Sequence, residues 1–512
     1  RGVSAAIVPA ENAGASTRAS PERREGVVLR PHQEVGVKFI RERRGTFLAD
    51  EMRCGKTPQI MYAHEPEAGV LIMIGPVASR LVWHEWAARR FGACADVLEG
   101  KECMTCQRVG AVEQELPSFI AVHGRTPDPA QLAAGDGRAP RVLFMNFQIA
   151  YGSSELFGAL PIGTLVIDEA HRAGLQNRRT QAVEAVRRFN TRAHRVIMAT
   201  GTPLENRPDG LWPILDILSP GAWGGYWEAM RRYANAQPGP FGWTTSGSSN
   251  VDELKLRLTE VMLRRTWAEI RPGLPPIERT IELVSLPARE VDRIEEYAAQ
   301  IRYQTKAKQT IVGQLATLRR LYAEAKIDAG VEWACETIAN GYSCVLWTYH
   351  RDVASKTVER LAEKGVRVHG PIHGGIDDKN REVILENAAV DVQGPRVLVA
   401  TMNALGFAVN LSWASHAGFV ELDWIPNTIS QAEMRSFDGT RSISVTLFVS
   451  DTDTDRRLAE ALLSKLATQH DLGLKAGAGD VADVLHASFG FEDAQTLDEL
   501  AEILIADARL EV

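Results

Sequence analysis

Short apolar runs alternate with longer amphipathic segments along most of the chain, beginning at Val27. Runs such as GVLIMIGP and GTLVIDEA are nearly continuous in apolar residues, which is typical of strands buried on both faces of a parallel sheet. Each run is followed by a helix-like segment or a polar loop. This repeated strand–helix alternation predicts an α/β fold with doubly wound sheets.

The alternation stops near residue 221 and resumes after about residue 330, so the pattern predicts two α/β lobes with a mostly helical insert. The insert begins with a segment rich in Gly, Pro, Ser and Trp and continues with amphipathic helical patterns. We expect a flexible tail at 1–26, a first lobe at 27–220, the helical insert at 221–330, a second lobe at 331–470 and a small acidic helical tail at 471–512.

Charge is distributed unevenly over the 512 residues, whose net charge is −7. Residues 451–512 carry 14 acidic and 5 basic side chains, a net of −9, so residues 1–450 sum to +2. Local basic faces rather than net charge attract nucleic acid, so a DNA partner is not excluded. The acidic tail has apolar residues at helical spacing, and it either packs on the second lobe, docks a protein partner or shields a DNA path.

No window approaches the ~18 uncharged apolar residues of a transmembrane helix, so we expect no membrane partner. Six cysteines indicate a reducing compartment rather than a disulfide scaffold. Cys103 and Cys106 form a CxxC pair, with Cys94 before it and His123 after it. Zinc sites usually combine two close pairs, and only one is present. The sequence therefore favours ordinary reduced cysteines, and structural zinc is the less favoured alternative.

The strongest local signal for chemistry is ADEMRCGKT, residues 49–57, between an apolar run and a helical pattern. In such a position, backbone N–H groups and the helix N-terminus face phosphate groups. Lys56 would reach the β- and γ-phosphate oxygens, and Thr57 would bind Mg²⁺. A Gly-Lys-Thr triplet alone occurs too often by chance to establish a nucleotide site.

Two adjacent carboxylates, Asp168 and Glu169, end the apolar run at 165–167. Ligands of α/β proteins bind where parallel strands end, so Asp168 is predicted to hold Mg²⁺ and Glu169 to orient and deprotonate the attacking water. A solvated acidic turn is the alternative, and the upstream Gly-Lys-Thr favours the catalytic interpretation. A third strand end, ATGTP, places Thr200 and Thr202 where they would link a phosphate site to a second ligand.

In their order and spacing, these motifs resemble those of the Snf-type DNA translocases of helicase superfamily two, over about residues 27–468. LRPHQ at 29–33 resembles the opening motif, ADEMRCGKT motif I, DEAH at 168–171 motif II and ATGTP motif III. TMNALG at 401–406 resembles motif V, and QAEMR at 431–435 resembles the start of motif VI.

The resemblance implies two RecA-like lobes, ATP and Mg²⁺ as cofactors, and double-stranded DNA as partner. It implies a nucleotide-binding set of Arg30, Gln33, Arg53, Cys54, Gly55, Lys56, Thr57 and Gly406. It also implies a catalytic set of Lys56, Asp168, Glu169 and Arg435, and a coupling or DNA-contact set of Thr200, Thr202, Thr401, Arg264 and Arg265.

A narrower resemblance is carried by FGWTTSGSSN at 241–250 and MLRR at 262–265, which are similar to the HARP-like annealing-helicase branch. That branch anneals strands and remodels forks, which implies forked DNA as a further partner.

Two motifs depart from the family pattern. Motif I has Arg53 and Cys54 where the family has Gly-Leu, and the second arginine of motif VI is replaced by Asp438. An arginine near the transferring phosphoryl group can contribute ~10³–10⁵ in rate, and an aspartate there would repel it. We expect Arg441 to take the missing place; the alternative is weak hydrolysis.

The sequence thus predicts an ATP-dependent translocase on double-stranded DNA that hydrolyses ATP between two lobes. Strand annealing or fork remodelling is the more specific activity that it would carry out. Two alternatives stay open: a nucleotide-gated DNA-binding scaffold with weak or no hydrolysis, and a motor subunit that joins a larger assembly through its acidic tail. Substrate structure, direction of travel and pathway are not determined. The Ala/Arg-rich composition predicts a bacterial or phage-infected cell, with a cytoplasmic, nucleoid-associated location.

Overall fold

The computed structural model describes residues 28–452 except 99, 113–117, 123–139, 154–159, 174, 176–179, 204–207, 240–241, 246–248, 272, 274, 276, 305–307, 392, 406–408, 424–425 and 438. The predicted tails at 1–26 and 471–512 lie outside the described residues, as do His123, Gly406 and Asp438.

The first lobe is built on a seven-stranded parallel sheet whose strands follow the order β3-β4-β2-β5-β6-β1-β9. The strands are β1 (Gly45–Leu48), β2 (Val70–Ile74), β3 (Phe119–Ala121), β4 (Val142–Met145), β5 (Ile162–Asp168), β6 (Arg195–Ala199) and β9 (Met262–Leu263). Most of them consist of buried apolar residues, as a sheet covered on both faces requires.

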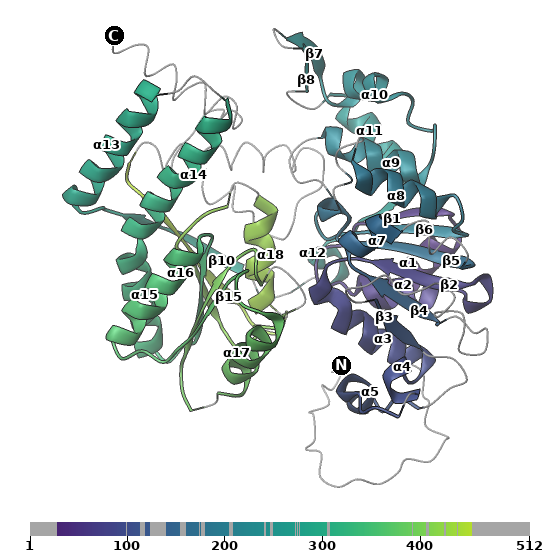
Figure 1. Cartoon of the computed structure of the whole chain (residues 1–512), viewed down its shortest axis with the longest axis horizontal. Coiled ribbons are helices and arrows are strands. Elements are labelled where there is room, and N and C mark those ends of the chain that lie inside the picture. Colours follow the sequence, from purple (N-terminus) through teal and green to yellow (C-terminus); the bar gives the residue numbers. More distant parts are fainter. Residues whose placement is uncertain are drawn as a thin grey trace, which may run out of the picture.

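Helices cover both faces of this sheet (Figure 1). One face packs against α1 (Pro31–Arg41), α2 (Lys56–Ala63) and α3 (Arg80–Phe91). The other packs against α7 (Phe147–Ser153), α8 (Gln181–Asn190) and α9 (Trp212–Leu218). The short helices α4 (Ala95–Leu98) and α5 (Met104–Arg108) lie between α3 and β3 along the chain. Because β5, β6 and β1 are neighbours, their carboxyl ends bring motifs II, III and I together.

The second lobe is a six-stranded parallel sheet in the order β10-β15-β14-β11-β13-β12. Its strands are β10 (Ile277–Val284), β11 (Cys344–Thr348), β12 (Val368–Ile372), β13 (Val397–Thr401), β14 (His416–Phe419) and β15 (Ile443–Ser450). The helices α15 (Ile327–Ala339) and α16 (Arg351–Glu363) cover one face, and α17 (Asp378–Val390) and α18 (Pro426–Ser436) cover the other. The predicted fold class of two doubly wound α/β lobes is confirmed.

The predicted insert does not form a separate unit. Its first part, with α10 (Tyr226–Tyr233), the hairpin β7 (Ala236–Gly239)–β8 (Gly242–Thr245) and α11 (Val251–Leu258), shares the apolar core of the first lobe. Its β9 pairs with β1, while β10 pairs along its whole length with β15 of the second lobe. The expected boundaries at 220 and 330 therefore need correction, because the chain passes from one sheet to the other between β9 and β10.

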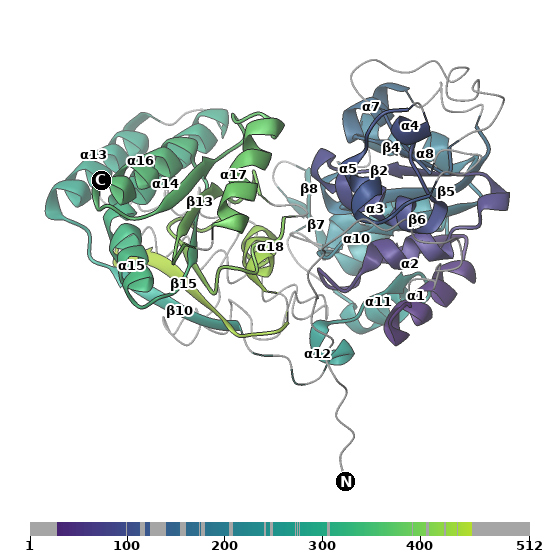
Figure 2. The same ribbon diagram turned by 90° about the horizontal axis from the view of Figure 1, so that it is seen from below.

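The remaining helices of the insert belong to the second lobe or to the crossing point. The helices α13 (Ala288–Gln304) and α14 (Lys308–Ala325) stand beside α15 and α16 in both views (Figures 1 and 2). The short helix α12 (Trp267–Ile270) lies where the chain crosses between the lobes (Figure 2). Among the described residues, none of the helices has the length and apolar character needed to span a membrane.

Candidate nucleotide site between the lobes

The phosphate-loop residues connect β1 to α2. Gly55, the residue before the first turn of α2, has a left-handed backbone with φ 77°. A Cβ at this position would lie 2.2 Å from the side-chain nitrogen of Gln33, so both backbone conformation and space require glycine. Lys56 Nζ donates hydrogen bonds to the carbonyls of Asp50 (2.7 Å) and Glu51 (3.1 Å). The ammonium group is therefore held at the mouth of the loop by backbone oxygens that phosphate oxygens can replace.

Buried charges beneath this loop fix its shape. Asp50 is fully buried and pairs with the guanidinium group of Arg265, and Gln59 donates to the same carboxylate at 3.0 Å. The neighbouring Arg264 donates to the carbonyl of Ala49 at 2.8 Å. Burial lowers the pKa of Arg264, and the nearby acidic groups oppose that shift. Both arginines are structural partners of motif I, so the predicted DNA contact through Arg264 and Arg265 does not fit this geometry.

The two carboxylates of motif II lie at the end of β5. Asp168 Oδ2 accepts a hydrogen bond from the indole N–H of Trp83 on α3 at 2.9 Å. Burial raises the pKa of Asp168 to about 6, and the negative charge of Glu169 adds to the increase. The Trp83 donor and the positive charge of Lys56 act in the opposite direction. Glu169 adopts a left-handed φ of 49°, which turns the chain sharply as the strand ends.

A buried polar cluster connects motif II to motif III and to the second lobe. A ring nitrogen of His171, Nδ1, lies 2.7 Å from the hydroxyl of Thr200 and 3.3 Å from that of Thr202. The side-chain nitrogen of Gln431, on α18, lies 3.4 Å from the hydroxyl of Thr202 and 3.4 Å from His171 Nε2. The same histidine ring lies 3.4 Å from a carboxylate oxygen of Glu169. The cluster therefore joins an acidic residue of the first lobe to a helix of the second.

Arginine side chains cross the boundary between the lobes. The guanidinium group of Arg53 donates to the backbone oxygens of Arg435 (2.7 Å) and Phe437 in the second lobe. Arg53 itself has a left-handed backbone with φ 63°, a conformation that usually favours glycine. Burial lowers the pKa of Arg435 to about 10, an effect that Glu169 opposes and Arg53 increases. Two cationic side chains thus meet opposite the acidic pair.

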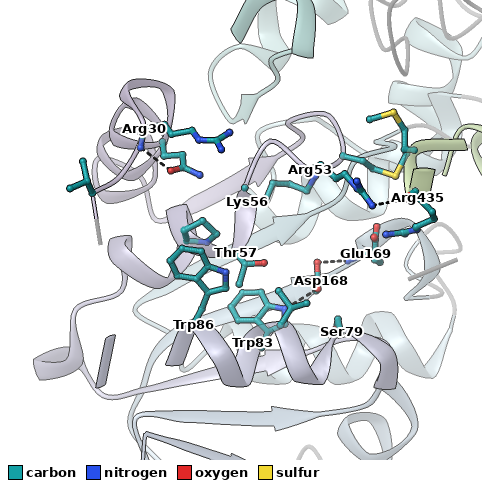
Figure 3. Close-up of a pocket in the computed structure, with 17 residues that line it drawn as sticks. Arg30, Arg53, Lys56, Thr57, Ser79, Trp83, Trp86, Asp168, Glu169 and Arg435 are labelled. Carbon is teal, nitrogen blue, oxygen red and sulfur yellow. Dashed lines mark hydrogen bonds between the residues drawn. The ribbon is translucent and has the colours of Figure 1, made fainter. Parts of the chain in front are cut away.

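Arg53, Arg435 and the acidic pair line one cavity of about 500 Å³. Figure 3 shows Lys56, Thr57, Asp168 and Glu169 approaching it from the first lobe and Arg435 from the second, with Arg53 reaching toward Arg435. The lining also includes the predicted Arg30, Gln33 and Gly55. Ser79, Trp83 and Trp86, also of the first lobe, complete it. Lys56 and Arg435 therefore face a common pocket.

Other predicted residues do not line this cavity. The guanidinium group of Arg441 donates to the carbonyl of Ser412 in the second lobe, so the expected placement of Arg441 at the phosphate is not found. Thr401 is buried at the end of β13, where its side chain does not present a surface for DNA. The side chain of Cys54 is 2% exposed and contributes to the core, although its carbonyl oxygen lies 2.9 Å from the ring of His32.

Sequence reasoning missed Trp83 as a site residue. The available signal was chemical: a buried indole N–H almost always has a hydrogen-bond partner. Glu51 was missed as well. It is 2% exposed, it accepts a hydrogen bond from the backbone N–H of Trp267 at 2.7 Å, and burial raises its pKa. Its partner lies 216 residues away, so local patterns could not indicate its role.

Comparison with known proteins finds similarity to SNF2-related proteins. The SNF2-related domain family matches residues 122–324. Over 465 residues the chain is 27% identical to a SWI/SNF-related matrix-associated actin-dependent regulator of chromatin subfamily A-like protein 1 of Xenopus tropicalis, a match that covers 88% of this chain and 45% of the relative. It is also 27% identical over 433 residues to the human DNA annealing helicase and endonuclease ZRANB3. That match covers 81% of this chain and 37% of the human protein.

The chain therefore spans less than half the length of these curated relatives. Among solved structures it matches a Sulfolobus solfataricus SWI2/SNF2 ATPase core in complex with double-stranded DNA, with 20% identity and a TM-score of 0.39 over 91% of this chain and 98% of that one.

The predicted bacterial or phage-associated cytoplasmic location is wrong on these findings. The similar curated proteins come from animals, and their names connect them to chromatin and to DNA annealing. Ala/Arg-rich composition reflects base composition, which does not distinguish such sources. Residues 122–324 match the SNF2-related domain family, and over most of its length the chain is similar to the SWI/SNF-related subfamily A-like proteins and to a DNA annealing helicase.

Proposed function

We propose that the chain is an ATP-dependent translocase on double-stranded DNA. The observation that carries this proposal is the single cavity lined by Lys56, Asp168 and Glu169 from one lobe and by Arg435 from the other. A site of this composition suits a triphosphate, because cations meet the phosphates and carboxylates serve the metal and the attacking water. Arg30 and Gln33, at the outer end of the cavity, would face the adenine.

The first lobe supplies the groups for hydrolysis. Thr57 and Asp168 offer the hydroxyl and carboxylate oxygens that Mg²⁺ prefers, and Mg²⁺ bound there would neutralise charge on the phosphates. Glu169 would orient a water molecule and accept its proton. The contact of 3.4 Å between Glu169 and His171 holds the carboxylate near the buried polar cluster.

The second lobe would complete the site only when the lobes are together. Arg435 and Gln431 lie four residues apart on α18, so they project from the same side of the helix. Arg435 reaches the cavity while Gln431 reaches His171 and Thr202. A change at the phosphates would therefore alter the contacts of a whole helix, which is how ligand-driven lobe closure is transmitted.

Double-stranded DNA is the partner that the relationship favours, since a similar protein is named as a DNA annealing helicase. If both lobes grip one duplex, each cycle of closing and opening becomes a step along it. The candidate grips are loops near Pro76–Arg80, Asn146–Phe147 and His373–Gly374, which would contact phosphates and give affinity without sequence readout. Strand annealing and fork remodelling are the finer activities proposed on the same ground.

ATP turnover measured with duplex, forked and single-stranded DNA tests the proposal. We expect duplex or forked DNA to stimulate turnover, and Lys56→Ala and Glu169→Gln to abolish it while the chain remains folded by circular dichroism. Turnover that is indifferent to DNA, or equal in Lys56→Ala, would contradict the proposal.

A second candidate function is a nucleotide-gated DNA-binding scaffold. It is favoured by the position of Arg441, which bonds to Ser412 and leaves Arg435 as the second-lobe guanidinium among the described cavity-lining residues. This candidate predicts binding of ATP and DNA with negligible phosphate release that Glu169→Gln leaves unchanged. Single-turnover phosphate release from the wild-type chain distinguishes the two functions.

A further inference from the structure

Three of the six cysteines gather with a histidine in the first lobe, away from the nucleotide cavity. The cluster consists of His84, Cys94, Cys103 and Cys106, whose potential ligand atoms all lie within 4.8 Å of one another. The structure records all six cysteines of the chain as free thiols. The cysteines of the cluster are 1%, 9% and 2% exposed in sequence order, and His84 is 9% exposed.

The cluster has four potential ligands from three separate segments. His84 comes from the middle of α3, and Cys94 comes from the loop that follows this helix. Cys103 is the residue immediately before α5, and Cys106 lies in the first turn of α5. The CxxC pair is thus completed by two residues that lie earlier in the chain. His123, the histidine that the sequence suggested, lies outside the described residues.

The measured distances agree with tetrahedral zinc. With bonds of about 2.3 Å to sulfur and about 2.0–2.1 Å to nitrogen, tetrahedral geometry requires about 3.6 Å between a ligand nitrogen and a ligand sulfur. In the structure, His84 Nε2 lies 3.6 Å from Cys106 Sγ and 3.8 Å from Cys103 Sγ. These two distances differ from the required separation by at most about 0.2 Å.

The surroundings hold the histidine ring in a fixed orientation. The imidazole of His84 stacks on the ring of Phe119, with centroids 4.6 Å apart and planes inclined by 5°. This arrangement directs Nε2 toward the sulfur atoms, and an oriented ring is a usual feature of metal-binding histidines. Around the cluster lies an apolar core that includes Trp83, Ala87 and Phe144, so the ligands are shielded from water.

We propose that His84, Cys94, Cys103 and Cys106 bind one zinc ion as a closed structural site. Three thiolates and one imidazole form a Cys₃His set, which is a common tetrahedral set for structural zinc, and four protein ligands leave no open position for catalysis. Binding would release the thiol protons to solvent and would involve no change of oxidation state. The ion would fasten the segment from Cys94 to Cys106 onto α3.

The proposal differs from the preference for ordinary reduced cysteines that the sequence suggested. Only one close pair is visible along the chain, but the fold brings a histidine of a preceding helix and a third cysteine to that pair. It does not depend on the proposed translocase function, because a structural site is required by folding whatever the chain does. The competing interpretation is a disulfide between two of the three thiols, which the same proximity would permit.

Metal analysis of the full chain, purified without chelator, tests the inference. We expect one zinc per chain by elemental mass spectrometry, and X-ray absorption showing three sulfur ligands and one nitrogen ligand. Cys103→Ser and His84→Asn should lose most of the zinc. The matched controls, Cys335→Ser and His123→Asn, should keep it, since Cys335 lies on α15 of the second lobe.

Two measurements on the wild-type chain keep the test decisive if a ligand variant fails to fold. Removal of zinc by a chelator should lower the melting temperature, and added zinc should restore it. Alkylation without prior reduction, followed by mass spectrometry, should find all three thiols free once the metal is removed. Absence of bound metal, a Cys94–Cys106 or Cys103–Cys106 disulfide, or zinc that is lost in His123→Asn and kept in His84→Asn would overturn the proposal.

Discussion

The two walls of the nucleotide cavity are built in different ways. On the first lobe, the phosphate loop is fixed from below by the Asp50–Arg265 ion pair, and Asp168 is held by Trp83. On the second lobe, one helix, α18, supplies both Arg435 and Gln431. The first wall is thus preformed by its own lobe, while the contribution of the second depends on where a single helix lies. The site residues of the first lobe can therefore keep their positions, and movement of the second lobe can complete the site.

The two walls also differ in how they contact each other. The first lobe reaches across with Arg53, whose partners are backbone carbonyls of the second lobe. The second lobe reaches across with side chains, Gln431 and Arg435, toward His171, Thr202 and the cavity. Bonds to backbone depend on helix position alone, whereas bonds between side chains also depend on residue identity. Substitutions on either side can therefore separate lobe closure from chemistry.

The largest effect expected from the second lobe is at Arg435. Arg435→Ala should lower DNA-stimulated ATP turnover by about 10³-fold or more, because it removes the second-lobe guanidinium group that lines the cavity where the proposed function requires the phosphates. Arg441→Ala is the matched control and should remain close to wild type, since Arg441 bonds to Ser412 away from the cavity. If Arg441→Ala proved as damaging as Arg435→Ala, Arg441 would have to enter the site during turnover.

The next prediction concerns the buried carboxylate of the first wall. Burial raises the pKa of Asp168 from 3.8 to about 6, so Mg²⁺-dependent nucleotide binding should weaken as pH falls through about 6. Asp168→Asn should abolish turnover, yet stabilise the ligand-free chain at pH 8 by on the order of 1–3 kcal/mol, because the buried charge is removed.

The sign of this stability effect can be checked by pH. A carboxyl group whose pKa is raised in the folded state destabilises the fold above that pKa, and the penalty vanishes below the unfolded value of 3.8. The difference in melting temperature between Asp168→Asn and wild type should therefore be largest at alkaline pH and disappear at acidic pH. A constant difference across the range would show that Asp168 is not the responsible group.

A smaller effect is expected at Trp83, which donates to Asp168 from α3. Trp83→Phe keeps an aromatic ring and removes the donor that lowers the pKa of Asp168, so the acid limb of the turnover profile should move to higher pH. Turnover at neutral pH should fall by about tenfold, the equivalent of one hydrogen bond to a charged group. Trp86→Phe, on the same wall, is the control and should leave the acid limb in place.

The smallest effect is expected at Arg53. Arg53→Gly suits the left-handed backbone but removes the hydrogen bonds to the second lobe, so lobe closure rather than chemistry should suffer. We expect about three- to tenfold weaker nucleotide binding, with a larger radius of gyration in solution scattering. Arg53→Lys keeps the charge and loses the planar fork, so it should resemble Arg53→Gly if geometry is what matters. Unchanged scattering in both variants would refute this role.

Local sequence was sufficient for the fold class and for the residues of the first wall. The apolar runs identified most of the strands of both sheets. GKT lies at the start of α2, after the loop that follows β1, and DEAH begins at the last residue of β5, so both motifs lie at the same edge of the sheet. Lys56, Thr57, Asp168 and Glu169 were therefore predictable. The family resemblance also placed Arg435 opposite them, because it assigns QAEMR to motif VI of the second lobe.

Long-range partners could not be predicted in the same way. The family resemblance implied Arg264 and Arg265 as DNA contacts, but β9 extends the first sheet and brings them against motif I. The domain boundaries expected at 220 and 330 also differ from the structure, because β9 pairs with a strand of the first sheet and β10 with a strand of the second. A two-residue strand has too short a pattern to be recognised without its neighbour.

The sequence by itself determined which residues could perform phosphate chemistry, since strand-end motifs are local and their spacing is fixed by the chain. The tertiary structure decided which of them share a cavity, which arginines are buried as supports, and which histidine joins the cysteines of the first lobe. The physical reason is that ion pairs, hydrogen bonds and metal coordination act over a few ångströms in space, while their partners lie up to hundreds of residues apart in the chain.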